Sequence, residues 1–144
     1  MKRVAINGFG RIGRAAFKII MDTPGLEIVA INDLMSIENA AYLLQYDSIY
    51  GKYQYVVNVD ERYLHIKEKK VLFISEGSQI KLPWKELEID IVIESTGHFT
   101  LLEEAGKHIY AGAKFVVISG PTRSKGVPTV VHGVNTGDGK TTIF

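Results

Sequence analysis

The feature that most constrains this chain is a glycine-rich run, Gly8-Phe9-Gly10-Arg11-Ile12-Gly13, followed about twenty residues later by Asp33. The apolar run Val4-Ala5-Ile6 precedes it like a short buried strand, and the residues from Arg14 to Met21 have helical spacing. A second apolar strand, residues 27–32, then leads directly to Asp33. Strand, glycine-rich turn, helix, strand and acid follow one another in the order that a dinucleotide-binding βαβ unit requires.

Each residue type in this pattern has a physical role. Gly8 can make the tight turn, Gly10 lets the backbone approach a pyrophosphate, and Gly13 lets the helix pack closely on the strand. The start of the helix supplies free N–H groups and partial positive charge to the phosphates. Asp33 is expected to accept hydrogen bonds from a ribose diol and to repel a 2′-phosphate. The pattern therefore favours NAD over NADP.

Composition limits the other functions of the chain. Its 144 residues fit one domain, residues 1–144, and 17 basic against 16 acidic residues leave a net charge of +1. Such a balance favours neither nucleic acid nor an anionic membrane as a partner. No cysteine is present, so this chain holds no disulfide, zinc–thiolate site or cysteine nucleophile. Only three apolar residues follow Met1-Lys2-Arg3, and no apolar stretch is long enough to span a bilayer, so we expect a cytoplasmic protein.

The order of apolar and amphipathic segments predicts an α/β fold of the Rossmann type, a doubly wound and mostly parallel sheet with helices on both faces. The first helix is expected to bury Ile12, Ala16, Ile19 and Ile20, and a second one, capped by Ser36, to bury Ile37, Ala41 and Leu44. Three short strands, 54–60, 63–66 and 71–75, are too close for crossover helices and predict a small antiparallel excursion over about residues 54–75.

After residue 75, apolar strand segments again alternate with a helical segment. Further strands are expected at 89–95, 114–119 and 128–134, with another beginning at Lys140. A capping box, Thr100-Leu101-Leu102-Glu103, predicts a helix that ends near Ala111-Gly112.

In an open parallel sheet, ligands bind beyond the carboxyl ends of the strands. Four polar loops qualify: Asn7 to Arg11, Asn32 to Leu34, Ser95 to Phe99 and Ser119 to Thr122. Thr96 and Gly97 are expected to approach the cofactor closely. Leu34 and Phe99 could form opposite walls of an adenine pocket, although Phe99 fits ordinary core packing equally well. Ser119 could donate to the nicotinamide side or cap a turn.

The four histidines, His65, His98, His108 and His132, share no ligand spacing, so no metal site is expected. His108 is expected in the last turn of a helix, where the helix dipole favours it. His98 lies in a loop that faces the ligand.

The chain resembles the phosphorylating glyceraldehyde-3-phosphate dehydrogenase family along its whole length. The resembling segments are Val4 to Arg14, Ala30 to Leu34, Leu44 to Ser48 before Gly51, Leu82 to Trp84, Glu94 to Gly97, Ala111 to Lys114, Ile118 to Pro121 and Gly133 to Asn135. The resemblance implies the NAD-binding domain of a glycolytic oxidoreductase that acts on an aldehyde with NAD and phosphate. It also implies a homo-oligomer, a tetramer in the family, with no nucleic-acid or membrane partner.

The resemblance also implies roles for single residues. Arg11 and Ile12 would hold the pyrophosphate through their backbone, Leu34 and Phe99 would flank adenine, and Thr96 and Ser119 would lie along the cofactor. The residue at the position of Gly77 would contact adenine through its backbone carbonyl, although the family usually carries a larger side chain there. His98 and Gly120 are milder variants of their loops. The expected cofactor-binding residues are Asn7, Gly8, Phe9, Gly10, Arg11, Ile12, Gly13, Asp33, Leu34, Gly77, Thr96, Gly97, Phe99 and Ser119.

The family's catalytic cysteine would follow just after Phe144, and its catalytic histidine and phosphate-binding residues would come later. The chain alone is therefore expected to bind the cofactor and to catalyse nothing; glyceraldehyde 3-phosphate and phosphate would bind only to the full-length enzyme. The cofactor domain of erythrose-4-phosphate dehydrogenase is an alternative, although that group tends to carry Glu where Asp33 stands. A non-catalytic, redox-sensing NAD(H)-binding module is another, although no helix-turn-helix signal or basic face supports DNA binding.

Overall fold

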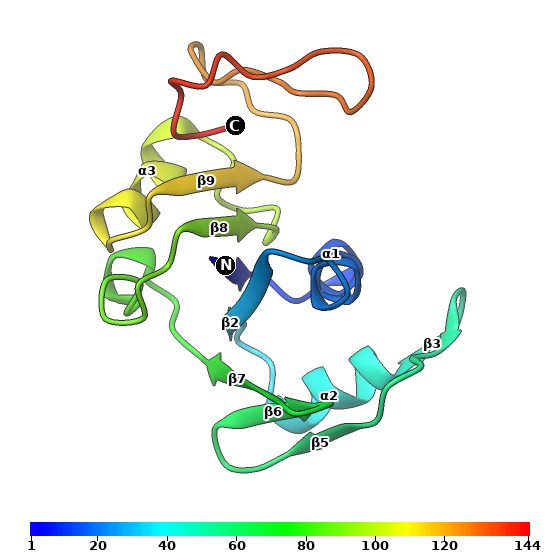
Figure 1. Ribbon diagram of the computed structural model, residues 1–144. Coiled ribbons are helices and arrows are strands. Elements are labelled where there is room, and N and C mark those ends of the chain that lie inside the picture. The colour runs from blue at the N-terminus through cyan, green and yellow to red at the C-terminus, as the bar shows by residue number, and fades with distance from the viewer.

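A computed structural model describes residues 1–144. Its main sheet has seven strands in the order β5-β6-β7-β2-β1-β8-β9 (Figure 1). Those strands are β1 (Lys2–Asn7), β2 (Leu26–Asn32), β5 (Val57–Val59), β6 (Tyr63–Ile66), β7 (Lys69–Ile74), β8 (Ile91–Glu94) and β9 (Phe115–Ile118). A separate antiparallel pair is formed by β3 (Tyr46–Asp47) and β4 (Gly51–Lys52). The helices are α1 (Arg11–Met21), α2 (Ile37–Gln45) and α3 (Leu102–Tyr110), with a single 3-10 turn, η1 (Gln79–Lys81).

The direction of the strands confirms the predicted Rossmann-type topology. Strands β7, β2, β1, β8 and β9 run parallel to one another. The chain leaves β1 through α1 to reach β2 on one side, and it later places β8 on the other side of β1. This reversal between β1 and β8 is the switch point at which doubly wound sheets bind their ligands.

The predicted antiparallel excursion is present and is joined to the main sheet. Strands β5, β6 and β7 pair antiparallel in sequence order, while β7 also pairs in parallel with β2. The excursion therefore extends one edge of the main sheet, and its last strand is an ordinary member of the parallel part.

Two apolar cores cover the two faces of the sheet. On β1, Val4 and Ile6 point to the core under α1 and α2, while Ala5 points to the core that contains Trp84 and lies under α3. Figure 1 shows α1 and α2 on one side of the sheet and α3 on the other. Neighbouring strand residues thus face opposite cores, as the two-residue period of a strand requires.

The predicted inner face of α1 is partly wrong. Ile12 and Ile19 are 58% and 68% exposed, whereas Gly13, Phe17, Ile20 and Met21 are buried. The cause is the glycine-rich turn: Gly13 must lie against Gly8, and this contact rotates the Gly13–Phe17–Ile20 face toward the sheet. The inner face of α2 and its Ser36 cap are confirmed, since Ser36 Oγ accepts a hydrogen bond from Asn39 N at 3.2 Å.

The expected strand at 128–134 is wrong. Those residues form no ladder, and Asn135 instead folds back locally, its Oδ1 accepting from Val131 N at 2.6 Å. The free edge of β9 is taken by the last residues of the chain, where Val116 N donates to Thr142 O and Phe144 N donates to Val116 O. Residues 128–134 therefore pair with no strand, and the strand expected to begin at Lys140 is present only as an isolated parallel bridge between Ile143 and Val116.

The predicted cap of α3 is displaced by one residue. The helix begins at Leu102, and Glu104, rather than Glu103, reaches back to accept from Leu101 N at 3.3 Å. Thr100 therefore stands outside the cap. None of the helices is both long and apolar enough to cross a membrane.

Candidate functional site

A cavity of about 320 Å³ opens at the carboxyl ends of β1, β2 and β8, which is the switch point of the sheet. Its volume lies at the lower end of the range that small-molecule sites occupy. Eight of the predicted cofactor residues line it: Asn7, Gly8, Gly10, Asp33, Leu34, Gly77, Thr96 and Phe99. Met35, Glu76 and His98 also line it, so four separate loops meet at one cavity.

The glycine-rich turn forms one wall of the cavity, and close contacts require glycine at two of its three glycine positions. Gly8 has φ +93°, and a Cβ there would lie 2.5 Å from Thr96 N. A Cβ on Gly13 would overlap the carbonyl oxygen of Gly8. A Cβ on Gly10 would meet nothing, because that position faces the open cavity. Gly8 and Gly13 therefore allow the turn to pack closely against the protein, and Gly10 leaves space on the side that faces the cavity.

Asp33 follows β2 and is held at the edge of the cavity. One carboxylate oxygen accepts from Phe9 N at 2.7 Å, and the other accepts from Met35 N at 3.0 Å. Each oxygen has lone pairs left over after these contacts. The half-buried carboxylate is thus fixed in place and keeps acceptor capacity for a diol.

The other predicted residues lie around the cavity without lining it. Phe9 is buried and packs edge-on against Phe17, with 5.7 Å between the ring centroids. Arg11, Ile12 and Gly13 form the first turn of α1, where the free backbone N–H groups of the helix lie. The remaining two predicted residues are on the β8 and β9 loops: Gly97, with φ +75°, and the exposed Ser119.

The charged groups beside α1 are arranged away from the cavity. Arg11 Nη2 lies 3.5 Å from Asp47 Oδ1. Backbone N–H groups of Tyr50 and Ile49 lower the pKa of Asp47, and Arg11 adds to that effect. Burial lowers the pKa of Arg14, and the positive charge of Arg11 lowers it further. No group of His, Asp and Glu side chains is arranged to hold a metal ion.

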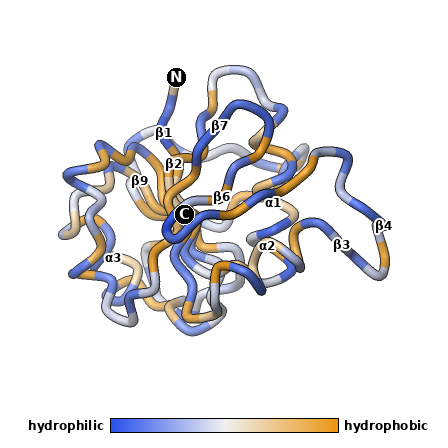
Figure 2. Tube along the Cα trace, turned by 90° about the horizontal axis from the view of Figure 1, so that it is seen from below, coloured by the Kyte–Doolittle hydropathy of each residue, from blue (hydrophilic) through white to orange (hydrophobic).

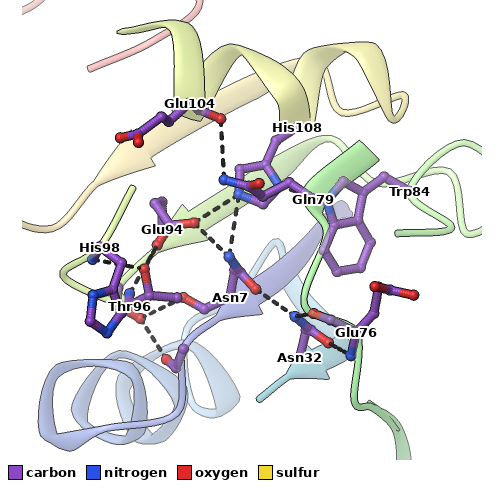
Figure 3. Close-up of polar contacts among 12 residues, drawn as sticks. Asn7, Asn32, Glu76, Gln79, Trp84, Glu94, Thr96, His98, Glu104 and His108 are labelled. Carbon is purple, nitrogen blue, oxygen red and sulfur yellow. Dashed lines mark hydrogen bonds and ion pairs between the residues drawn. The ribbon is translucent and has the colours of Figure 1, made fainter. Parts of the chain in front are cut away.

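Beneath the cavity lies a buried polar cluster that is not predicted from the sequence (Figure 3). Glu94, at the end of β8, is 2% exposed, and His108 of α3 is fully buried. Glu94 Oε2 accepts from Asn7 Nδ2 at 2.6 Å and lies 2.8 Å from His108 Nε2. His108 lies in the last turn of α3, as predicted, and it is in addition a buried core residue that faces β8.

The geometry of the cluster fixes the tautomer of His108. Trp84, the single tryptophan, lies with its indole Nε1 3.0 Å from His108 Nδ1. Because an indole N–H can only donate, His108 Nδ1 accepts, and the proton of the neutral ring lies on Nε2. The ring then donates to Glu94, so the two side chains form a hydrogen bond rather than an ion pair.

A glycine-rich turn at the switch point, a helix N-terminus beside it and an oriented aspartate after β2 define a dinucleotide-binding domain of the Rossmann type. Residues 2–102 match the profile of the family described as "Glyceraldehyde 3-phosphate dehydrogenase, NAD binding domain". The chain belongs to this family, and its cofactor is NAD.

The chain is also similar to individual proteins named glyceraldehyde-3-phosphate dehydrogenase. The glyceraldehyde-3-phosphate dehydrogenase of Mycoplasma pneumoniae is 50% identical over 133 residues, which are 92% of this chain and 40% of that protein. That of Clostridium pasteurianum is 48% identical over 138 residues, covering 96% of this chain and 41% of its own length. That of Geobacillus stearothermophilus is 44% identical over 133 residues, with 92% and 39% covered. The chain thus spans about two fifths of the length of the curated relatives it matches.

The residues present fit an NAD molecule on structural grounds. Gly10 leaves space at the turn, Asp33 offers acceptors beside it, and apolar Leu34 and Phe99 line the same cavity. Such a division, with apolar walls and a few placed polar groups, is typical of a nucleotide pocket.

Proposed function

We propose that this chain is the cofactor-binding part of a phosphorylating glyceraldehyde-3-phosphate dehydrogenase. The whole protein would oxidise glyceraldehyde 3-phosphate with NAD and phosphate, and this chain would hold and orient the cofactor. NAD supplies the hydride acceptor, while the protein supplies binding, orientation and electrostatics. The family and the named relatives support this proposal.

The observation that carries the proposal is the placement of Asp33. Its carboxylate stands beside the glycine-rich turn, and Phe9 N and Met35 N hold both oxygens in place. In this position the carboxylate would accept hydrogen bonds from the adenosine ribose. The same negative charge would repel the 2′-phosphate of NADP.

The remaining contacts follow from the positions around the cavity. The backbone N–H groups at Arg11 and Ile12 would face the pyrophosphate. Leu34 and Phe99 would flank the adenine, and the Gly77 backbone would approach it from the opposite loop. Asn7, Gly8, Phe9, Gly10 and Gly13 would shape the turn, while Thr96 and Gly97 would line the cofactor.

Ser119 would contact the cofactor farther from the adenine. It follows β9, one strand beyond the cavity, and its N–H donates to Glu94 O at 2.9 Å. We assign it to the nicotinamide half because it lies next to β8 on the side away from Asp33.

The 144-residue chain alone would bind NAD without catalysing the reaction, because it contains no cysteine that could attack an aldehyde. We also propose that it self-associates, in keeping with the oligomer expected for the family. Large apolar side chains that remain exposed, including Ile49 and Tyr50, support this part of the proposal.

Calorimetric titration of the chain with NAD and NADP tests the cofactor assignment. We expect NAD to bind more tightly than NADP. Asp33→Ala should weaken NAD binding by about 10- to 150-fold, because a hydrogen bond to a charged group is worth roughly 1.5–3 kcal/mol. The same variant should narrow the preference for NAD over NADP.

Asp60→Ala is the matched control. Asp60 also accepts two backbone hydrogen bonds, from Arg62 N at 3.0 Å and Tyr63 N at 2.9 Å, but it lies in the turn between β5 and β6. This variant should bind NAD like the unmodified chain. Equal affinities for NAD and NADP in the unmodified chain would refute the assignment of Asp33.

A further inference from the structure

A chain of side-chain hydrogen bonds, buried at its centre and part-buried at its ends, crosses the floor of the cavity from one wall to the other (Figure 3). At one end, Asn32 of β2 accepts from Glu76 N at 2.9 Å and donates to Glu76 O at 2.9 Å. Asn32 Nδ2 also donates to Asn7 Oδ1 at 2.7 Å, and Asn7 Nδ2 donates to Glu94 Oε2 at 2.6 Å. Three neighbouring strand ends are thereby tied together below the ligand space.

Glu94 connects this floor to the opposite wall. Its second oxygen, Oε1, accepts from Thr96 N at 2.9 Å and from Thr96 Oγ1 at 2.6 Å. The Thr96 hydroxyl in turn accepts from His98 N at 3.1 Å. The path of the loop from Thr96 to His98, which lines the cavity, is therefore set through one carboxylate.

The carboxylate of Glu94 is suited to this task because all of its contacts are donors. Asn7 and His108 donate to one oxygen, and the two groups of Thr96 donate to the other. A carboxylate can accept four hydrogen bonds, and hydrogen bonds to an ionised acceptor are the stronger kind. A glutamine of the same size would turn an NH₂ group toward one pair of these donors.

We propose that Glu94 is a positioning residue for NAD binding, acting through Thr96 and supported by Asn7 and His108. It fixes the separation between the Glu76–Gly77 wall and the Thr96–His98 wall before the cofactor enters. This inference rests on the proposed function of the cavity as the NAD site. Preorganisation of this kind improves affinity because the bound loop conformation is already formed.

The test is a double-mutant cycle on NAD affinity, measured by calorimetry with Glu94→Gln, Thr96→Val and the double variant. We expect Glu94→Gln alone to weaken NAD binding by about tenfold, as loss of charged hydrogen bonds implies. In the Thr96→Val background the same change should cost roughly threefold or less, because residues that act through one contact are not additive. Equal effects in both backgrounds would overturn the proposal.

Asp90→Asn is the control for a merely structural role. Asp90 immediately precedes β8, at the opposite end of the strand from Glu94, and it accepts two part-buried hydrogen bonds, from Arg3 N at 2.9 Å and from Lys114 Nζ at 2.6 Å. The Asp90→Asn variant should have a lower free energy of unfolding, while its NAD affinity should stay within about twofold of that of the unmodified chain. If Asp90→Asn weakened NAD as much as Glu94→Gln does, the effect would be general destabilisation and the proposal would be wrong.

Two further results separate the possible failures. If the unmodified chain bound no NAD, the proposed function would fail, whereas tight binding that is unchanged in folded Glu94→Gln would refute only the role of Glu94. If Glu94→Gln did not fold, hydrogen exchange in the unmodified chain would decide. The Thr96 amide should exchange slowly because it donates to a buried carboxylate, and exchange at the rate of a free loop would contradict the contact.

Discussion

At the scale of single residues, substitution by alanine is expected to change stability in opposite directions at Gly13 and Gly106, although both lie in helices. Ala normally stabilises a helix relative to Gly by roughly 1 kcal/mol. Gly106→Ala in α3 should do so, since a Cβ there meets nothing within 4 Å. Gly13→Ala should instead destabilise by about 1–3 kcal/mol, because the methyl group would overlap Gly8 O and touch Ser95 Oγ. Urea unfolding measures both, and a Gly13→Ala variant as stable as the unmodified chain would contradict the close contact.

Residues of the site were predictable from the sequence where their role depends on the backbone. Gly8 and Gly13 could be assigned because a tight turn and a close helix contact require glycine wherever they occur. Glu94 and His108 could not, because their burial depends on how α3 packs over β8. The acid at the end of an apolar strand was the one available signal, and it becomes meaningful only once its partners, Asn7 and Thr96, are placed.

At the scale of elements, Asp90 joins the beginnings of three strands. It precedes β8, and its carboxylate accepts from Arg3 N on β1 and from Lys114 Nζ just before β9. The hydrogen bond from Lys114, followed by that from Arg3 N, lowers the pKa of Asp90 below its ordinary 3.8. A lowered pKa means that the folded state prefers the ionised form, so this contribution to stability is present above about pH 5 and is lost as the pH falls through the lowered pKa.

Asp90→Asn should therefore reduce the free energy of unfolding near neutral pH, and the difference from the unmodified chain should shrink at about pH 3 and below. Urea unfolding at several pH values measures this. A difference that stayed constant across that range would mean that the ionised carboxylate is not what joins these strands.

Strands could be predicted where a segment has the local apolar pattern of a strand and also has a free sheet edge to pair with. Strands β1, β2, β8 and β9 were expected because each is a short apolar run between turn residues. Residues 128–134 have the same local pattern and form no strand, since the edge of β9 is already occupied by Thr142 and Phe144. Pairing is decided by which segment reaches an edge, and a local pattern carries no information on that competition.

At the scale of the whole molecule, exposed apolar side chains gather around a projecting hairpin. Strands β3 and β4 extend away from the body of the molecule (Figure 2). In the connection between the two strands, Ile49 is 70% exposed and Tyr50 is 79% exposed, and Tyr46 on β3 is 49% exposed. Aromatic and aliphatic side chains left in water together are typical of an interface, so we expect a second copy of the chain to cover them.

Sedimentation velocity at several concentrations should accordingly show a dimer or larger species that grows with concentration. Ile49→Glu should shift the population toward monomer, because a charge would then have to be buried when two copies meet. Tyr110→Glu is the matched control: Tyr110 is 89% exposed at the end of α3, on the opposite face of the sheet, and its change should leave association unaltered. A clean monomer at every concentration would refute self-association, and equal loss in both variants would place the contact elsewhere than at the hairpin.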